Sequence, residues 1–93
     1  MRLSQELVKM FKEVIYSIDR NATILLFGSR TNDNKTGGDI DLLIISDKIS
    51  FNDKLKIRKE FFKNVEEQKI DLCIRKNLSD PFVQLVLKNA IKL

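Results

Sequence analysis

The sequence predicts one small α/β domain of the α+β type, with a mixed β-sheet of about three strands and helices packed on one face of that sheet. With 93 residues, the chain is long enough to bury a single core. Apolar residues recur in two patterns: short continuous or alternating runs typical of strands, and longer stretches with helical spacing. These patterns give the order helix, strand, strand, helix, strand, helix. We find no repeat or linker, so residues 1–93 are expected to form one domain.

Three segments have helical spacing. Residues 3–19 carry one apolar stripe, with Ser4 as a possible N-cap. Residues 50–67 begin with Ser50 and Asp53, a pair that resembles a capping box. The segment 82–93 follows Pro81, which suits a first helical turn, and its apolar residues form two stripes, Phe82, Leu85, Val86 and Leu93 on one side and Val83, Leu87 and Ile91 on the other. We expect this last helix to cover the core, and its second stripe either to join that core or to meet a partner.

Three shorter segments are expected to be strands. Residues 22–27 form an apolar run that Gly28 ends. In residues 40–46 the alternation places Ile40, Leu42 and Ile44 on one face. The other face carries Asp41, Leu43 and Ile45, with Asp39 just before them. Residues 69–75 repeat this alternation, with Asp71 and Cys73 sharing a face.

Composition excludes several kinds of chemistry. Histidine is absent, which removes imidazole bases and zinc sites with histidine ligands. The single cysteine cannot form an intrachain disulfide, which fits a reducing compartment. No apolar run is long enough to span a bilayer and the N-terminus has no signal-peptide core, so a cytoplasmic protein is expected. The net charge of +4 fits either a soluble lysine-rich surface or attraction to phosphate groups.

The acidic residues of the predicted strands indicate a metal site. Asp39 and Asp41 are two residues apart and therefore point to one face of their strand, where a divalent cation would relieve their mutual repulsion. The sequence Ile40-Asp41-Leu42 is repeated in form by Ile70-Asp71-Leu72. If the two strands are neighbours, three carboxylates meet, and such a set can hold two metal ions about 3.5–4 Å apart. Carboxylate oxygens favour Mg²⁺ or Mn²⁺. The alternative is that these aspartates are merely solvent-exposed.

The segment after the first predicted strand is a candidate phosphate site. Gly28 permits unusual backbone dihedrals and close approach, and Ser29 adds a hydroxyl and an N–H group. An ordinary strand-ending turn would have the same residues. The following loop lacks the signature of a Walker loop and of a dinucleotide-binding turn.

Together these residues resemble the polymerase-β-like nucleotidyltransferase superfamily. The resemblance rests on Gly28-Ser29, nine intervening residues, Asp39-Ile40-Asp41 and a later Asp71 in an apolar strand. It covers essentially the whole chain and implies a nucleotidyltransferase fold. The short length and the ending PFVQLVLKNAIKL resemble the minimal nucleotidyltransferase group within that superfamily.

The resemblance implies a role for each matched residue. Asp39 and Asp41 would bind two Mg²⁺ ions, with Mn²⁺ as a substitute, and Asp71 would help hold one ion and orient or deprotonate the acceptor hydroxyl. Gly28 and Ser29 would bind the β- and γ-phosphates of ATP. Arg30 would either add its charge to that phosphate site or be a surface residue.

The same resemblance implies a partner. Members of the minimal group are often encoded beside a HEPN-domain ribonuclease toxin and there resemble antitoxins, some of which transfer AMP from ATP to a tyrosine of the toxin. An adenylyltransferase antitoxin with a HEPN partner is therefore the leading expectation. The chain shows no separate acceptor-binding domain, which agrees with an acceptor on another molecule. The alternatives are a non-catalytic module that neutralises its partner by contact, and nucleotidyl transfer to a small molecule or an RNA end. Direct nucleic-acid binding is not expected, because no basic stripe is interleaved with aromatic residues.

Overall fold

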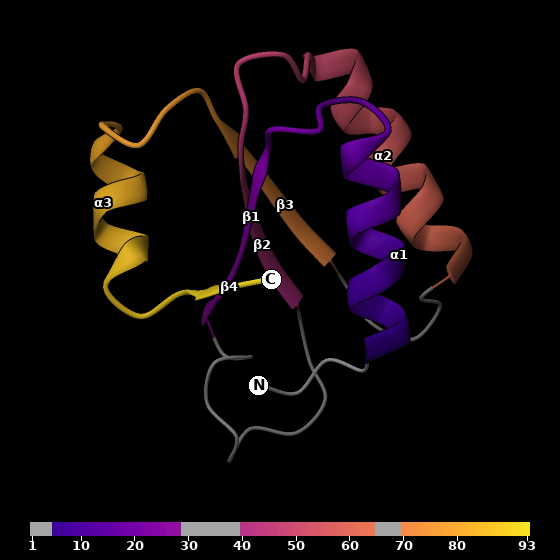
Figure 1. Cartoon of the computed structure of the whole chain (residues 1–93), viewed down its shortest axis with the longest axis horizontal. Coiled ribbons are helices and arrows are strands. Elements are labelled where there is room, and N and C mark those ends of the chain that lie inside the picture. The colour runs from indigo at the N-terminus through magenta and orange to yellow at the C-terminus, as the bar shows by residue number, and fades with distance from the viewer. Residues whose placement is uncertain (1–4, 29–39, 65–69) are drawn as a thin grey trace.

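The computed structural model describes residues 5–28, 40–64 and 70–93 of the chain (Figure 1). Helices and strands follow one another in the predicted order, and one short strand is added at the end. The elements are α1 (Gln5–Tyr16), β1 (Thr23–Phe27), β2 (Ile40–Ile45), α2 (Phe51–Asn64), β3 (Ile70–Arg75), α3 (Pro81–Leu87) and β4 (Ile91–Lys92). The predicted α+β class, with a small mixed sheet, is confirmed.

The four described strands form one sheet in the order β3-β2-β1-β4. β1 is antiparallel to both of its neighbours, whereas β2 and β3 run parallel. A parallel pair needs a long crossover connection, and the segment that contains α2 supplies it. The strands that carry Asp41 and Asp71 are therefore direct neighbours, as the carboxylate argument required.

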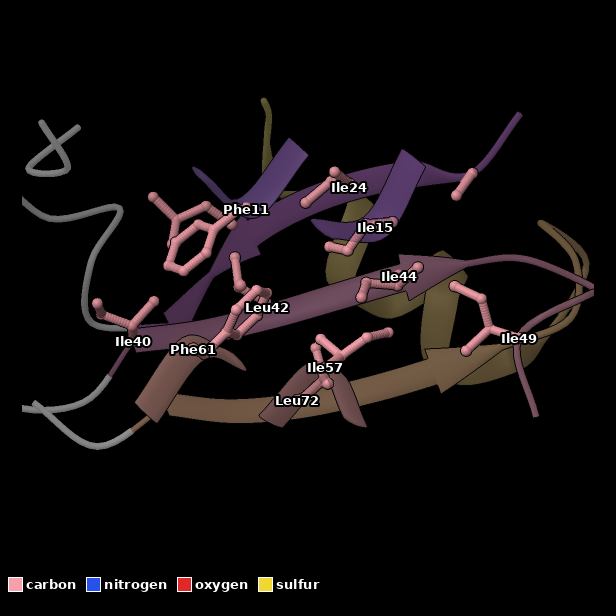
Figure 2. Close-up of a cluster of buried hydrophobic side chains, with 12 residues drawn as sticks. Phe11, Ile15, Ile24, Ile40, Leu42, Ile44, Ile49, Ile57, Phe61 and Leu72 are labelled. Carbon is pink, nitrogen blue, oxygen red and sulfur yellow. The ribbon is translucent and has the colours of Figure 1, made fainter. Parts of the chain in front are cut away.

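The larger core lies between the sheet and the two long helices. Figure 2 shows side chains of α1, α2 and three strands meeting on this face. Phe11 of α1 and Phe61 of α2 contact each other with ring centroids 4.5 Å apart. Alternation along β1 and β2 supplies most of the sheet side of the core. The residues concerned are almost completely buried: Ile24, Leu26, Ile40, Leu42 and Ile44.

A smaller core on the opposite face corrects the expectation that helices cover one face only. α3 packs on that face, and in Figure 1 it lies across the sheet from α1 and α2. The reason is the composition of β2, whose second face carries Leu43 and Ile45 and would otherwise expose them. Val83 and Val86 of α3 bury these residues.

The segment predicted as a helix over 82–93 also ends earlier than expected. α3 stops at Leu87, and Ile91–Lys92 pairs with the outer edge of β1. Pairing satisfies backbone groups of β1 that would otherwise form an open edge. The predicted division into two stripes was wrong as well, because Val83 and Val86, which it assigned to different stripes, are both buried, and Leu85 and Leu87, which it also separated, are both exposed.

The start of α2 agrees with the sequence, whereas the end of α1 does not. The Ser50–Asp53 capping box is confirmed: the Asp53 N–H donates to Ser50 Oγ at 3.1 Å, and the Ser50 N–H donates to Asp53 Oδ2 at 3.1 Å. α1 ends at Tyr16 rather than at residue 19. The predicted cap Ser4 and the predicted end of the second helix at residues 65–67 lie outside the described residues. In the described part of the chain, each helix is too short or too polar to cross a membrane.

Candidate active site

Two of the three predicted site carboxylates lie side by side. The parallel register of β2 and β3 pairs Asp41 directly with Asp71. Neighbouring strands are about 4.8 Å apart, and residues in register point to the same face of a sheet. The two carboxylates therefore project together from one face, and both side chains are only partly buried.

Strand alternation decides which face this is. In β2, Asp41 shares its face with Leu43 and Ile45, and in β3, Asp71 shares its face with Cys73. This is the face that α3 covers. Each aspartate is the second residue of its strand, so the pair lies at the beginning of both strands, beyond the apolar residues that α3 buries.

Gly28 borders the same pair from the end of β1. Its backbone has φ = +75°, a left-handed conformation that only glycine adopts without steric cost. A Cβ atom at this position would overlap Asp41 Oδ2 and would lie 3.1 Å from Asp41 Cγ. The carboxylate of Asp41 therefore uses the space that a side chain at residue 28 would fill. Sequence reasoning predicted an unusual backbone here, but not that Asp41 is the group it accommodates.

The other predicted site residues are Ser29, Arg30 and Asp39, and they lie outside the described residues. The phosphate-binding roles of Gly28, Ser29 and Arg30 and the third carboxylate therefore stay predictions. Among residues 5–28, 40–64 and 70–93, no group of three or more acidic or cysteine side chains is placed to hold a metal ion.

The donors that the structure does describe fit a hard divalent cation. Two adjacent carboxylates offer oxygen ligands only, and like charges this close favour a cation between them. The carboxylate of Asp41 occupies the space that the missing Cβ of Gly28 leaves. The residues that would hold Mg²⁺ are therefore Asp41 and Asp71, with Asp39 as the third ligand by prediction.

Phe27 is a neighbour of the site that sequence reasoning did not single out. The antiparallel register pairs it with Asp41, on the other side from Asp71. Its side chain packs with those of the α3 face, so it lies on the same face as the carboxylates. The sequence signal was its place directly before Gly28, but only the pairing of β1 with β2 makes it adjacent to Asp41.

The fold and the site together define a class: a small α+β domain with paired carboxylates at one end of a mixed sheet and a glycine turn beside them. Comparison with protein families identifies it further. The model of the family described as "Polymerase beta, Nucleotidyltransferase" matches residues 7–93, and the chain belongs to this family. The superfamily predicted from the sequence motifs is thereby confirmed, and nucleotidyl transfer is the general activity that this membership indicates. A search of curated proteins gave no match.

Proposed function

We propose that this protein is a Mg²⁺-dependent adenylyltransferase that moves AMP from ATP to a tyrosine hydroxyl of a HEPN-domain ribonuclease toxin and so acts as the antitoxin. The observation that carries the proposal is the adjacent pair Asp41 and Asp71 beside Gly28. Family membership supports nucleotidyl transfer, and the sequence resemblance to the minimal group supports the acceptor and the partner.

The reaction would be an in-line substitution at the α-phosphorus. A bond forms between the acceptor oxygen and the α-phosphorus, and the bond from that phosphorus to the oxygen bridging to the β-phosphate breaks. Pyrophosphate leaves with the bonding electron pair, and the hydroxyl proton passes to a base. When bound, Mg²⁺ supplies neutralisation of the charge that develops on the phosphate oxygens.

The described residues have separate tasks in this scheme. Asp41, whose carboxylate occupies the space beside Gly28, would ligate the Mg²⁺ that binds the triphosphate. Asp71, one strand further along the sheet, would orient the acceptor hydroxyl and accept its proton. Positioning is the main protein contribution in such a scheme, because bringing hydroxyl and phosphate together removes much of the entropic barrier.

The chain's own tyrosine is poorly placed to be the acceptor. Tyr16 is the sole tyrosine of the 93 residues. It packs against the core formed with α1 and α2, on the face of the sheet opposite Asp41 and Asp71. If the acceptor is a tyrosine, it would therefore come from another molecule.

The test is transfer of label from α-³²P-ATP with Mg²⁺ to a purified HEPN partner. Asp71→Asn is expected to lower the initial rate by about 10²–10⁴-fold, the usual range for a lost general base. Asp47→Asn is the matched control, because Asp47 is exposed in the turn after β2 and should leave the rate unchanged. Absence of transfer by the wild-type protein, or equal transfer by Asp71→Asn, would falsify the proposal.

A contact-only antitoxin is the second candidate, and exposed apolar residues of α3 favour it. Leu85 and Leu87 are 63% and 40% exposed. If contact alone neutralises the toxin, Asp41→Asn retains neutralisation in a co-expression growth assay and Leu85→Glu loses it. The adenylyltransferase proposal expects Asp41→Asn to lose it. Val83 is unsuitable for this test, because it is fully buried and a charge there would damage the core.

A further inference from the structure

An aromatic residue continues the line formed by the two carboxylates. Registers across three strands place Asp71, Asp41 and Phe27 in one line perpendicular to the strands. Residues in such a line point to the same face and are separated by about 4.8 Å per strand. Phe27 is thus as close to Asp41 along the sheet as Asp71 is, on the opposite side.

The ring of Phe27 is backed by α3. It meets Phe82 edge to face, with ring centroids 6.0 Å apart and an interplanar angle of 82°. Phe82 is in turn held by Arg75, whose guanidinium carbon lies 4.9 Å from the ring centroid. Arg75 Nε lies 3.5 Å from Asp80 Oδ2, and Asp80 caps α3 by accepting hydrogen bonds from the first N–H groups of the helix.

This support makes Phe27 a rigid apolar surface beside a charged site. Phe27 is only partly buried, so a portion of the ring is accessible to a ligand. An aromatic side chain that is already fixed loses little conformational freedom on binding.

We infer that Phe27, supported by Phe82, is the surface on which the nucleobase of the bound nucleoside triphosphate stacks. A nucleoside triphosphate has a group for each part of this line of residues. Its phosphates would bind at the two carboxylates through a cation, and its flat aromatic base would stack on the Phe27 ring. Stacking on a side-chain ring does not read the edge of the base, so this contact predicts affinity for ATP and GTP alike. The inference rests on the proposed nucleotide site at Asp41 and Asp71.

The test compares two ligands that share phosphates but differ in the base. Mg²⁺-ATP and Mg²⁺-tripolyphosphate are titrated calorimetrically into the wild-type protein and into Phe27→Leu. We expect Phe27→Leu to weaken ATP binding about tenfold, equivalent to about 1.4 kcal/mol, and to change tripolyphosphate binding less than about twofold. Phe27→Tyr, which keeps the ring, should restore ATP binding. Phe51→Leu is the control, because Phe51 is 71% exposed at the start of α2 and on another surface.

Two outcomes overturn the inference: ATP binding by Phe27→Leu that equals that of the wild type, or an equal loss of affinity for ATP and for tripolyphosphate. If Phe27→Leu does not fold, NMR of the wild-type protein in complex with ATP still tests the inference. Intermolecular NOEs between the adenine H2 or H8 and the Phe27 ring protons are expected in the ATP complex, and their absence contradicts stacking.

These measurements need no toxin, so they separate the inference from the proposed function. Base stacking without label transfer would reject the adenylyltransferase proposal and keep the base site. Label transfer with equal ATP affinity in wild type and Phe27→Leu would reject the base site and keep the adenylyltransferase proposal.

Discussion

At the scale of single residues, the candidate site depends on an absent side chain. Gly28 has a left-handed backbone, and the space beside its Cα holds the carboxylate of Asp41. Two constraints therefore act on one residue: the dihedral favours glycine, and the neighbouring carboxylate excludes a Cβ atom. Any replacement adds a Cβ atom that overlaps the Asp41 carboxylate, even where the new residue tolerates the left-handed dihedral.

We expect Gly28→Ala to destabilise the fold by about 1–2 kcal/mol from the dihedral alone, with a further cost from displacing Asp41. Urea unfolding followed by circular dichroism measures this change. Gly28→Asn separates the two causes, because asparagine tolerates the left-handed region but still has a Cβ atom. An Asn variant as stable as the wild type would show that the overlap with Asp41 costs nothing.

A second residue-scale feature is a buried hydrogen-bonded pair at the other end of the sheet. Asp19 and Ser46 are 4% and 5% exposed, and Ser46 Oγ donates to Asp19 Oδ2 at 2.5 Å. Asp19 also accepts from the Asn21 N–H at 2.9 Å. The pair ties the turn that enters β1 to the turn that leaves β2, so it helps to set the register of both strands.

The pH dependence of stability follows from this pair. The hydrogen bond from Ser46, then that from the Asn21 N–H, and the nearby Lys48 charge hold the pKa of Asp19 below its ordinary value of 3.8. A carboxyl whose pKa is lower in the folded state stabilises the fold above that ordinary value. This stabilisation disappears as the pH falls through the lower folded value.

We therefore expect Asp19→Asn to be less stable than the wild type at pH 7, and the difference in unfolding free energy to shrink as the pH falls below about 4. Thermal unfolding at a series of pH values tests this. Asp47→Asn, at an exposed aspartate one residue from Ser46, is the control. A difference that stays constant down to pH 2 would assign the effect of Asp19 to shape rather than to charge.

At the scale of elements, α3 is the least self-sufficient helix. It has seven residues, and isolated helices of that length do not persist in water. Asp80 supports its first turn through Oδ1, which accepts from the Phe82 N–H at 2.8 Å and more weakly from the Val83 N–H at 3.4 Å. Pro81 supplies a preset first helical position.

We expect Asp80→Ala to lower the unfolding free energy by about 1 kcal/mol and to speed amide hydrogen exchange in α3 more than in α1 or α2. Asp80→Ser is the matched control: it keeps a cap but loses the ion pair with Arg75. Because both partners of that pair are partly exposed, its loss should cost less than about 1 kcal/mol. Equal effects of the two variants would mean that the ion pair, rather than the cap, holds α3.

At the scale of the whole molecule, stability comes mainly from the core between the sheet and the two long helices. Leu42 lies at its centre in β2 and is fully buried (Figure 2). Leu85, on the outer side of α3, is 63% exposed. The two leucines differ in environment and not in chemistry, which makes them a matched pair.

Leu42→Ala is expected to cost about 2–5 kcal/mol, because it removes buried methyl groups and leaves a cavity. Leu85→Ala should change stability by less than about 0.5 kcal/mol. Chemical denaturation of both variants makes the comparison. Since domains of this kind have about 5–15 kcal/mol in total, Leu42→Ala is expected to leave the protein marginally folded. A cost at Leu85 similar to that at Leu42 would indicate that its side chain is buried in solution.

Much of this molecule could be predicted from local patterns. Alternation along residues 40–45 separated the core face of β2 from the face with Asp41, and Ser50 with Asp53 identified the start of α2. Gly28 was expected to end a strand with an unusual backbone, and it does. Such features depend on residues close in sequence, so their periods and caps can be read from the chain itself.

Only the tertiary structure decided which distant residues meet. The parallel register placed Asp71 beside Asp41, and the antiparallel register placed Phe27 on its other side. Tertiary packing also moved α3 to the opposite face and ended it at Leu87, so that Ile91–Lys92 could cover the edge of β1. The physical reason is common to these cases: strand pairing and edge protection are long-range choices, made by burial and backbone hydrogen bonding over the whole sheet, and the local sequence does not encode them.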